Sequence, residues 1–531
     1  MADVTTSDRA STGAATGGQM KRTLTLTGVT VNGMALIAPG AFLWTTFQTQ
    51  ASQVNHGHPT GSDMWTGLLF AFILAMLTAW SYSQLARIYP DAGAGSSYYF
   101  AEAAFLDKEK PSHQRYARFA KLTFGWISHL YYWIYPGIMI AFIATLVGYI
   151  YTALTGSQLG WGALSLICVV SALGIGYIAY RGISGSTLTA IVINVIQIVT
   201  LVAMTIIFFI AFRIGHPHAG YVLSNAGGVI IPHNFINLLY QSTIAILLLV
   251  GFESITALGA EARNPGKDIQ RGVLISLMIQ GGFCYLLEYF GANFALGSAT
   301  ISATKGTNPY IAAGNNSAPI GTMLHNAANT MFGGGGTAVS LIVAATVLMA
   351  LIGTTLACIN TGVRVSYAMA RDKELPSILG SLHSRFATPH GGIWVLAALS
   401  AVIGIYGVHT VDNLTQITLA SNTGTFIVYG MTCLIAVVAF ASRHDRHILK
   451  HIVLPGTGFL MNFAELCGVV YLALAAGGSG ATDAIKALAI VGVWIAIGAL
   501  WVAFNPNKHA AKKVVNDRLD KRVELVQTTQ P

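Results

Sequence analysis

Apolar runs of about 20 residues recur along the chain, and short segments rich in charged residues, glycine and proline separate them. A helix of about 20 apolar residues spans the roughly 30 Å hydrocarbon core of a bilayer. We count twelve such runs between residues 25 and 504. The pattern therefore predicts an all-α integral membrane protein, in which residues 23–505 form a domain of about twelve transmembrane helices.

Most of the expected connections are short, but residues 297–336 form a long outer segment that could act as a lid. Residues 1–22 and the basic residues 506–531 are predicted to be cytoplasmic tails. The spans are expected at about 25–48, 64–86, 122–150, 158–180, 187–212, 245–271, 272–296, 338–370, 392–408, 413–441, 452–475 and 483–504.

Two of these spans contain residues that interrupt a helix. In span one, Pro39 lacks a backbone donor and disfavours helix at Ala38, and Gly40 follows it. In span six, Gly251 supplies the backbone freedom for a second break. An interrupted helix within a membrane leaves N–H and C=O groups that only protein, a cavity or a ligand can satisfy. Both spans are therefore predicted to be broken helices, with a simple proline kink as the alternative for span one.

The two interrupted spans are five spans apart, so the second unit would have the opposite orientation in the membrane. Paired broken helices at corresponding positions are typical of the binding site of a secondary transporter. We therefore predict inverted repeats at about 25–213 and 235–441, followed by two extra helices at about 452–504. The halves show no sequence similarity, so this symmetry rests on the interruptions alone.

Carboxylates also lie within the predicted spans, and an ionisable group in hydrocarbon marks a functional site by default. Glu253 lies close to Gly251 and is predicted to take part in coupling or gating. Glu288, in span seven, could pair with a tyrosine hydroxyl, carry a proton or bind a cationic group. Glu465, in span eleven, is interpreted as a packing group.

The composition supports a membrane protein, because 54% of the 531 residues are hydrophobic and 9% are charged, against about 25% charged in soluble proteins. The net charge of +9 does not indicate a nucleic-acid partner. With both termini in the cytoplasm, only Arg213, Lys305 and Lys486 of the 29 basic residues fall on the outer side. This asymmetry follows the positive-inside rule and predicts a multi-pass protein of the cell membrane, in contact with its lipid.

Other function classes lack their characteristic residues in this sequence. It contains no GxxxxGK[ST] phosphate loop and no HExxH motif, so we expect neither ATP hydrolysis nor an enzyme, and no ATPase subunit is implied. The five cysteines form no CxxC pair, and no metal site or cofactor is expected. A channel is disfavoured because no repeated filter or charged ring is present.

Three ordered stretches resemble signatures of the amino acid–polyamine–organocation transporter superfamily, and together they cover roughly residues 25–440. They are Gly251-Phe252-Glu253 with Glu261, Asn264-Pro265 and Asp268-Ile269; Ala370-Arg371-Asp372-Lys373-Glu374-Leu375-Pro376 with Thr388-Pro389; and Tyr89-Pro90-Asp91-Ala92-Gly93. The resemblance implies a fold of inverted five-helix repeats plus two helices. It also implies transport of an amino acid or related small amine by alternating access.

The resemblance further implies which residues line the substrate site. In the family, backbone N–H groups at the break in span one bind the substrate carboxylate, and carbonyl groups of span six bind its amine. Pro39 has no N–H to donate, so the amides that follow it would have to serve. The matching positions are Ala38, Gly40 and Ala41 in span one, Leu247, Val250 and Gly251 in span six, Tyr135 and Pro136 in span three, and Thr354 and Cys358 in span eight.

The residues leave the coupling mode open. The glutamate that matches Glu253 couples pH to gating in some family members. Sodium-independent members often carry a span-five lysine, and ungapped matching puts Gln197 at that position. The hydroxyls of Thr354 and Thr355 would suit Na⁺, whereas Glu253 and Glu288 would suit H⁺. A proton- or sodium-coupled transporter, an exchanger, a polyamine or amine antiporter, and a substrate sensor on a transporter scaffold are therefore the alternatives.

Overall fold

The computed structural model describes residues 24–37, 39–90, 96–106, 115–182, 187–214, 231–259, 261–292, 308–386, 388–441 and 443–507. Within these residues the chain is almost entirely helical, and its strands form one hairpin of β1 (Val54–Asn55) and β2 (His58–Pro59). Twelve helical segments of the described chain are long and apolar enough to cross a membrane. The prediction of an all-α protein with twelve spans is confirmed.

Helices therefore account for every span, and several shorter helices connect them. The first five spans and their connections contain α1 (Leu26–Ile37), α2 (Pro39–Ala51), η1 (Gly61–Asp63), α3 (Met64–Ile88), α4 (Ser97–Leu106), α5 (Arg115–Thr155), α6 (Trp161–Tyr180) and α7 (Thr187–Ile214). The next five contain α8 (Phe235–Ala245), η4 (Ile246–Leu248), η5 (Phe252–Leu258), α9 (Pro265–Phe290), α10 (Pro309–Gly314), α11 (Pro319–Phe332), α12 (Gly336–Arg371), η7 (Ser377–Gly380), α13 (His390–Gly407) and α14 (Val411–Phe440). The last two contain the π-helix η8 (Leu449–Val453), α15 (Leu454–Ala475) and α16 (Gly478–Phe504).

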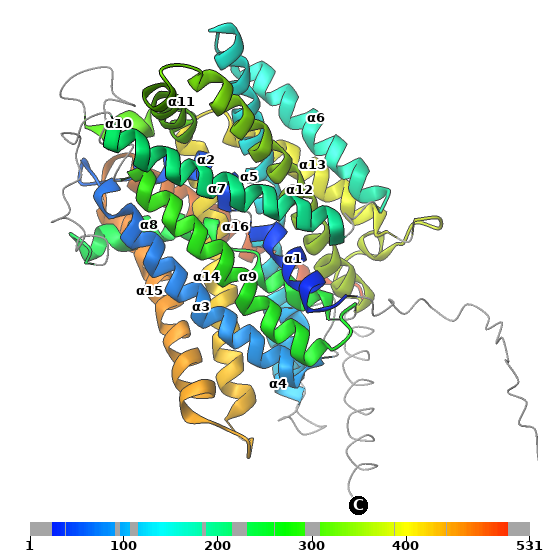
Figure 1. The fold of residues 1–531 in the computed structure, drawn as a ribbon. Coiled ribbons are helices and arrows are strands. Elements are labelled where there is room, and N and C mark those ends of the chain that lie inside the picture. Colours follow the sequence, from blue (N-terminus) through cyan, green and yellow to red (C-terminus); the bar gives the residue numbers. More distant parts are fainter. Residues whose placement is uncertain are drawn as a thin grey trace, which may run out of the picture.

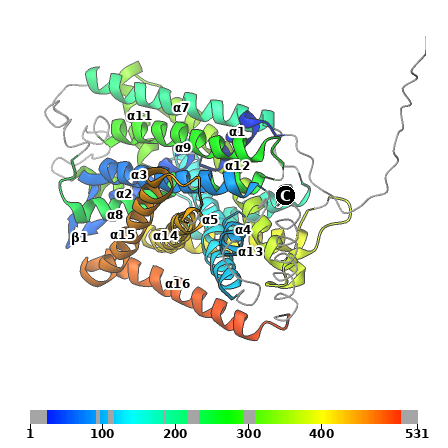
Figure 2. The ribbon, with the colours of Figure 1, turned by 90° about the horizontal axis from the view of Figure 1, so that it is seen from below.

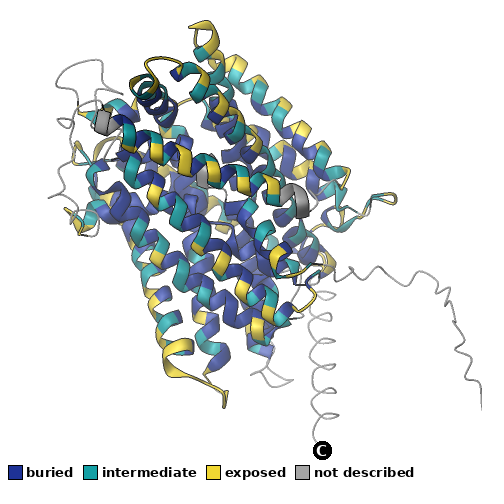
Figure 3. Cartoon of the chain, viewed as in Figure 1, coloured by how far each residue is buried: buried dark blue, intermediate teal, exposed yellow. Residues whose placement is uncertain are grey.

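The spans pack as a bundle in which span six is the most enclosed (Figure 1, Figure 3). The most apolar stretch of span six is 83% buried, whereas that of α16 is 17% buried. α5 packs against α12, α13 and α14, while α1 packs against α9 and η5. α16 and α7 lie at opposite edges of the bundle in Figure 2. Helices α10 and α11 lie at one end, called the α10 end below, and α4 lies towards the other, called the α4 end.

Span six is interrupted, as its sequence predicts. The α-helix α8 ends at Ala245, and the chain continues as the 3₁₀ segments η4 and η5 on either side of Gly251. Gly251 has φ 122°, a conformation that side chains with a Cβ rarely adopt. A Cβ at this position would also lie 3.1 Å from the carbonyl carbon of Leu36. Glycine is therefore required here both by the backbone conformation and by the close approach of α1.

Span one is described on either side of its predicted break. The described helix α1 reaches Ile37 and α2 starts at Pro39, while Ala38 between them lies outside the described residues. The break at Ala38–Gly40 therefore stays a prediction, as does the inverted repeat built on the pair of broken spans.

The connections agree only in part with the expected bounds. Of the predicted outer segment, residues 308–336 are described and contain α10, α11 and the first residue of α12. Their role as a lid stays a prediction. Span three begins earlier than expected, at Arg115, and charged side chains in its first turns have partners at the α4 end. Residues 1–22, 293–307 and 508–531, which include most of the predicted tails and the first part of the predicted outer segment, lie outside the described residues.

Candidate functional site

The interruption of span six lies against span one, two residues before the break predicted at Ala38. The Cβ position of Gly251 is 3.0 Å from Cδ2 of Leu36, one residue before the end of α1. One turn earlier in span one, α1 packs so closely on η5 that a Cβ on Gly33 would overlap the side chain of Ile255. The structure therefore brings together the two segments that the sequence predicts to form one site.

Glu253 is the charged group of this site, and its side chain is almost fully buried. Its Oε2 accepts hydrogen bonds from the backbone N–H of Gly251 at 3.0 Å and from the hydroxyl of Tyr429 at 2.7 Å. Its Oε1 accepts a bond from the hydroxyl of Tyr132 at 3.3 Å. Three donors can replace much of the hydration that a carboxylate loses on burial.

Tyr132 and Tyr429 are partners that sequence reasoning did not identify. Tyr132 belongs to α5 and lies 121 residues before Glu253 in the sequence. Tyr429 belongs to α14 and lies 176 residues after it. The run of aromatic residues in span three was a signal, since Tyr131, Tyr132 and Tyr135 pack against one another there. Span ten offered no such signal.

The other residues predicted in spans three, six and eight surround the same point. The hydroxyl of Tyr135 donates to the carbonyl oxygen of Leu247 at 3.3 Å, and this bond joins α5 to η4. The ring of Tyr135 also lies 5.6 Å from that of Phe42 in α2. Tyr135, Leu247, Val250, Gly251 and Cys358 are all buried. The site is therefore closed in this conformation.

The span-one positions are only partly described. Ala38 lies outside the described residues, and for Gly40 and Ala41 the structure gives the backbone alone. Both residues are helical and follow Pro39 in the described part of α2. Their role in binding a substrate carboxylate stays a prediction.

The N-terminal half of span one, α1, is held by hydroxyl and amide side chains. The hydroxyl of Thr354 lies 2.9 Å from the carbonyl oxygens of both Ala35 and Ala350 and can donate to either. The amide of Asn194 donates to Val31 O at 3.0 Å, and the amide of Gln280 donates to Met34 O at 3.2 Å. Gln280 also donates to Asn194 Oδ1 at 2.9 Å, so spans five, seven and eight all bind α1.

Thr355 and Gln197, both predicted to couple transport, form no hydrogen bond to another helix among the described residues. The hydroxyl of Thr355 donates to Leu351 O at 2.7 Å within its own helix. Gln197 is buried, and neither its amide nitrogen nor its oxygen has a hydrogen-bond partner among the described residues. The side chain that reaches α1 from span five is Asn194, one turn away, which sequence matching did not select.

Glu288 lies apart from Glu253 and contacts the other half of span one. Its Oε1 accepts a bond from Nε2 of Gln50, 2.9 Å away, in the last turn of α2. The suggested tyrosine hydroxyl is therefore not the partner that the structure shows. Gln50 in turn accepts, at its backbone oxygen, a bond from Gln241 of α8 at 2.9 Å. Glu288 thus acts on the junction between α2 and α8, towards the α10 end.

A cavity of about 330 Å³ extends from Ala35 and Thr354 towards the α4 end, between α1, α6, α7, η5 and α12. Thr354 and Arg364 line it. Nη2 of Arg364 lies 3.0 Å from Oε1 of Glu261, just beyond η5. This ion pair joins η5 to α12 at the end of the cavity.

A second group of charges ties α4 and α5 to the turn after α12. Nζ of Lys121, which is fully buried, lies 2.8 Å from Oδ2 of Asp372 and 3.3 Å from Oε1 of Glu102. Tyr98 donates to Asp372 at 2.9 Å, and burial together with the Asp372 carboxylate raises the pKa of Tyr98 well above its usual value. Arg118 forms a two-bond pair with Glu374.

The sequence is similar to known transport proteins. Residues 22–513 match the family model described as amino acid permease. A branched-chain amino acid permease of Lactococcus lactis is 26% identical over 64% of this chain and 68% of its own length. The methylthioribose transporter of Bacillus subtilis is 23% identical over 85% of this chain and 89% of its own. The low-affinity putrescine importer of Escherichia coli is 23% identical over 91% of this chain and 94% of its own.

Proposed function

This chain belongs to the amino acid permease family, and we propose that it is a secondary transporter that moves a neutral amino acid across the cell membrane by alternating access. The observation that carries the proposal is the contact between Leu36 and Gly251, where the interrupted span six meets span one beside the buried carboxylate of Glu253. Interrupted helices at mid-membrane present free backbone groups to a substrate.

The substrate's charged groups would bind the backbone. Its carboxylate would accept from the free amides of Gly40 and Ala41, aided by the positive end of α2. Its ammonium would donate to carbonyl groups of the interrupted span six, near Val250 and Leu247. The hydroxyl of Tyr135, now bonded to Leu247 O, would move or share this acceptor.

The substrate's side chain would be uncharged. The described residues predicted to surround it, Tyr135, Leu247, Val250 and Cys358, carry no charge, and Glu253 already receives three donors. A second ammonium group, as in a diamine, would lack a free carboxylate there. The similarity to branched-chain amino acid permeases supports an aliphatic side chain.

Coupling to protons through Glu253 follows from the chemistry of its donors. A carboxylate accepts all three bonds, whereas a protonated Glu253 carries an O–H that needs an acceptor. The N–H of Gly251 can only donate, but the hydroxyl of Tyr429 can turn and accept. Protonation would therefore loosen the bond to Gly251 and free the break in span six to move.

The ion pair between Glu261 and Arg364 would serve as the inner gate. Both side chains are partly exposed, at 24% and 28%, at the end of the cavity that reaches towards Thr354. Opening this pair would connect the site with the α4 end. By the positive-inside rule this end faces the cytoplasm, with both termini.

Uptake into proteoliposomes that contain the purified full-length chain tests the proposal. We expect leucine, isoleucine and valine to enter down an imposed proton gradient with no requirement for sodium. Uptake of putrescine in place of these amino acids would support an amine transporter. Binding of an amino acid without net flux or exchange would identify a sensor and overturn the proposal.

A further inference from the structure

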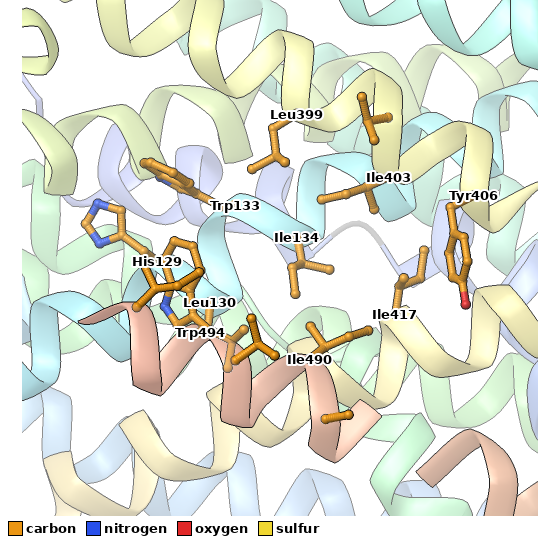
Figure 4. Close-up of a pocket in the computed structure, with 14 residues that line it drawn as sticks. His129, Leu130, Trp133, Ile134, Leu399, Ile403, Tyr406, Ile417, Ile490 and Trp494 are labelled. Carbon is orange, nitrogen blue, oxygen red and sulfur yellow. The ribbon is translucent and has the colours of Figure 1, made fainter. Parts of the chain in front are cut away.

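A second cavity, of about 610 Å³, lies beside the face of α5 that carries His129, Leu130 and Ile134 (Figure 4). It is bounded by α5, α13, α14 and α16. The lining residues Val402 and Val493 are 65% and 60% exposed, so the cavity opens as a groove on the membrane-facing surface. Its volume lies within the roughly 300–1,000 Å³ typical of sites for small molecules.

The groove presents only hydrocarbon, although four of its lining side chains carry polar atoms. His129 bonds Gly125 O and the hydroxyl of Ser366, and the indole N–H of Trp133 also donates to Ser366. The indole N–H of Trp494 donates to Trp126 O at 2.9 Å, and the Tyr406 hydroxyl donates to Gln416. Because these bonds turn the polar atoms towards protein, an occupant of the groove must be apolar along this length.

A basic side chain marks one end of the groove. Ala489, Ile490 and Val493 line the groove from one face of α16, and Lys486 lies on the same face one turn earlier. Lys486 is exposed. The lining from Ala489 to Ile497 spans eight helical steps, which is about 12 Å of helix at 1.5 Å per residue. An ammonium beside an apolar groove of this length matches the phosphate and acyl chain of one lipid.

We propose that this groove is a binding site for an anionic phospholipid, with one acyl chain between α13 and α16 and the phosphate at Lys486. A chain seated there would support α5 from behind. Leu130 and Ile134 face the groove, while Tyr132 and Tyr135 on the other side of the helix bond Glu253 and Leu247. Lipid binding would therefore stabilise the position of the tyrosines that hold the interruption of span six.

Photo-crosslinking of the full-length chain in phosphatidylglycerol vesicles tests this site. The probe is phosphatidylglycerol with a diazirine in one acyl chain, and labelled residues are mapped by mass spectrometry. We expect labels on the groove face of α16, near Ile490 and Val493. Labels spread evenly around α16 would show only the annular lipid that coats any membrane protein, and would overturn the proposal.

Variants of α16 separate the groove from the general surface. Ala489→Trp fills the groove and should abolish the labels, whereas Ala499→Trp, at an exposed position on the opposite face of α16, should leave them unchanged. Lys486→Gln should weaken labelling, because it removes the ammonium that would bind the phosphate. If Ala489→Trp and Lys486→Gln are both labelled to the same extent as the wild-type chain, the groove is not a lipid site.

Two further outcomes keep the test decisive. If Ala489→Trp fails to fold, the label positions in the wild-type chain and the effect of Lys486→Gln still decide. If Ala489→Cys instead forms disulfide-linked pairs of chains in the vesicles, a second copy covers the groove and the lipid proposal is wrong. None of these readouts depends on transport, so they stand apart from a failure of the proposed activity.

Discussion

The hydroxyl of Tyr429 donates to Oε2 of Glu253 across 2.7 Å and so joins span ten to the interruption of span six. The same carboxylate oxygen accepts from the N–H of Gly251, where the helix is broken. A change in the charge of one buried group is therefore transmitted directly to the backbone that would bind substrate. Hydrogen bonds to charged groups contribute about 1.5–3 kcal/mol, which is enough to bias a conformational equilibrium.

Removing this donor should change the pH dependence of transport. In Tyr429→Phe the ionised carboxylate loses a donor and the protonated acid loses an acceptor, and the ionised form loses more because hydrogen bonds to charged groups are stronger. We expect slower uptake, and the pH at which uptake changes should move upward. Uptake measured in proteoliposomes from pH 5 to 8 checks this. The control is Tyr240→Phe, whose hydroxyl has no hydrogen-bond partner among the described residues. Equal profiles for wild type and Tyr429→Phe would remove Tyr429 from the mechanism.

Replacing the carboxylate itself should have a stronger effect. Glu253→Gln keeps the shape of the side chain but cannot exchange a proton. We therefore expect uptake to become independent of pH and to fall well below the wild-type rate, while exchange of substrate across the membrane persists. Proton-driven uptake and counterflow, measured on the same vesicles, separate the two effects. Wild-type uptake across pH 5 to 8 would show that Glu253 is not the coupling group.

The break in span six should tolerate no side chain. Gly251→Ala places a Cβ 3.0 Å from Leu36 at φ 122°, and such strained residues cost about 1–3 kcal/mol. We expect weaker substrate binding and a lower midpoint of thermal unfolding. Gly282→Ala, in the neighbouring helix α9, is the matched control because its Cβ would meet nothing within 4 Å. If both variants bind substrate equally well, the break is not part of the site.

The sequence was sufficient for the spans and for the interruption of span six because both depend on local signals. Apolar length predicts a span, and Gly251 acts on the backbone at its own position. The partners of Glu253 were not predictable, because Tyr132 and Tyr429 reach it from distant helices. The bond from Asn194 to α1 was likewise not predictable, because it depends on the packing of α7 on α1.

The ion pair at the end of the smaller cavity should control access to it. Arg364→Glu places two carboxylates together, and the repulsion should favour an open inner gate. We expect faster labelling of a cysteine introduced at Asn360, which lines this cavity, by a membrane-impermeant thiol reagent applied from the cytoplasmic side. The charge reversal Glu261→Arg combined with Arg364→Glu should restore slow labelling. Unchanged labelling in the single variant would show that the pair is not a gate.

The buried lysine at the α4 end should matter for stability more than for substrate specificity. Lys121→Met leaves the carboxylates of Glu102 and Asp372 without this cation, and breaking a buried ion pair on one side costs about 3–5 kcal/mol. We expect a clear fall in the thermal unfolding midpoint and an unchanged order of substrate preference. Lys450→Met, at an exposed position, should shift the midpoint little. A midpoint like that of wild type in Lys121→Met would contradict the role of this network.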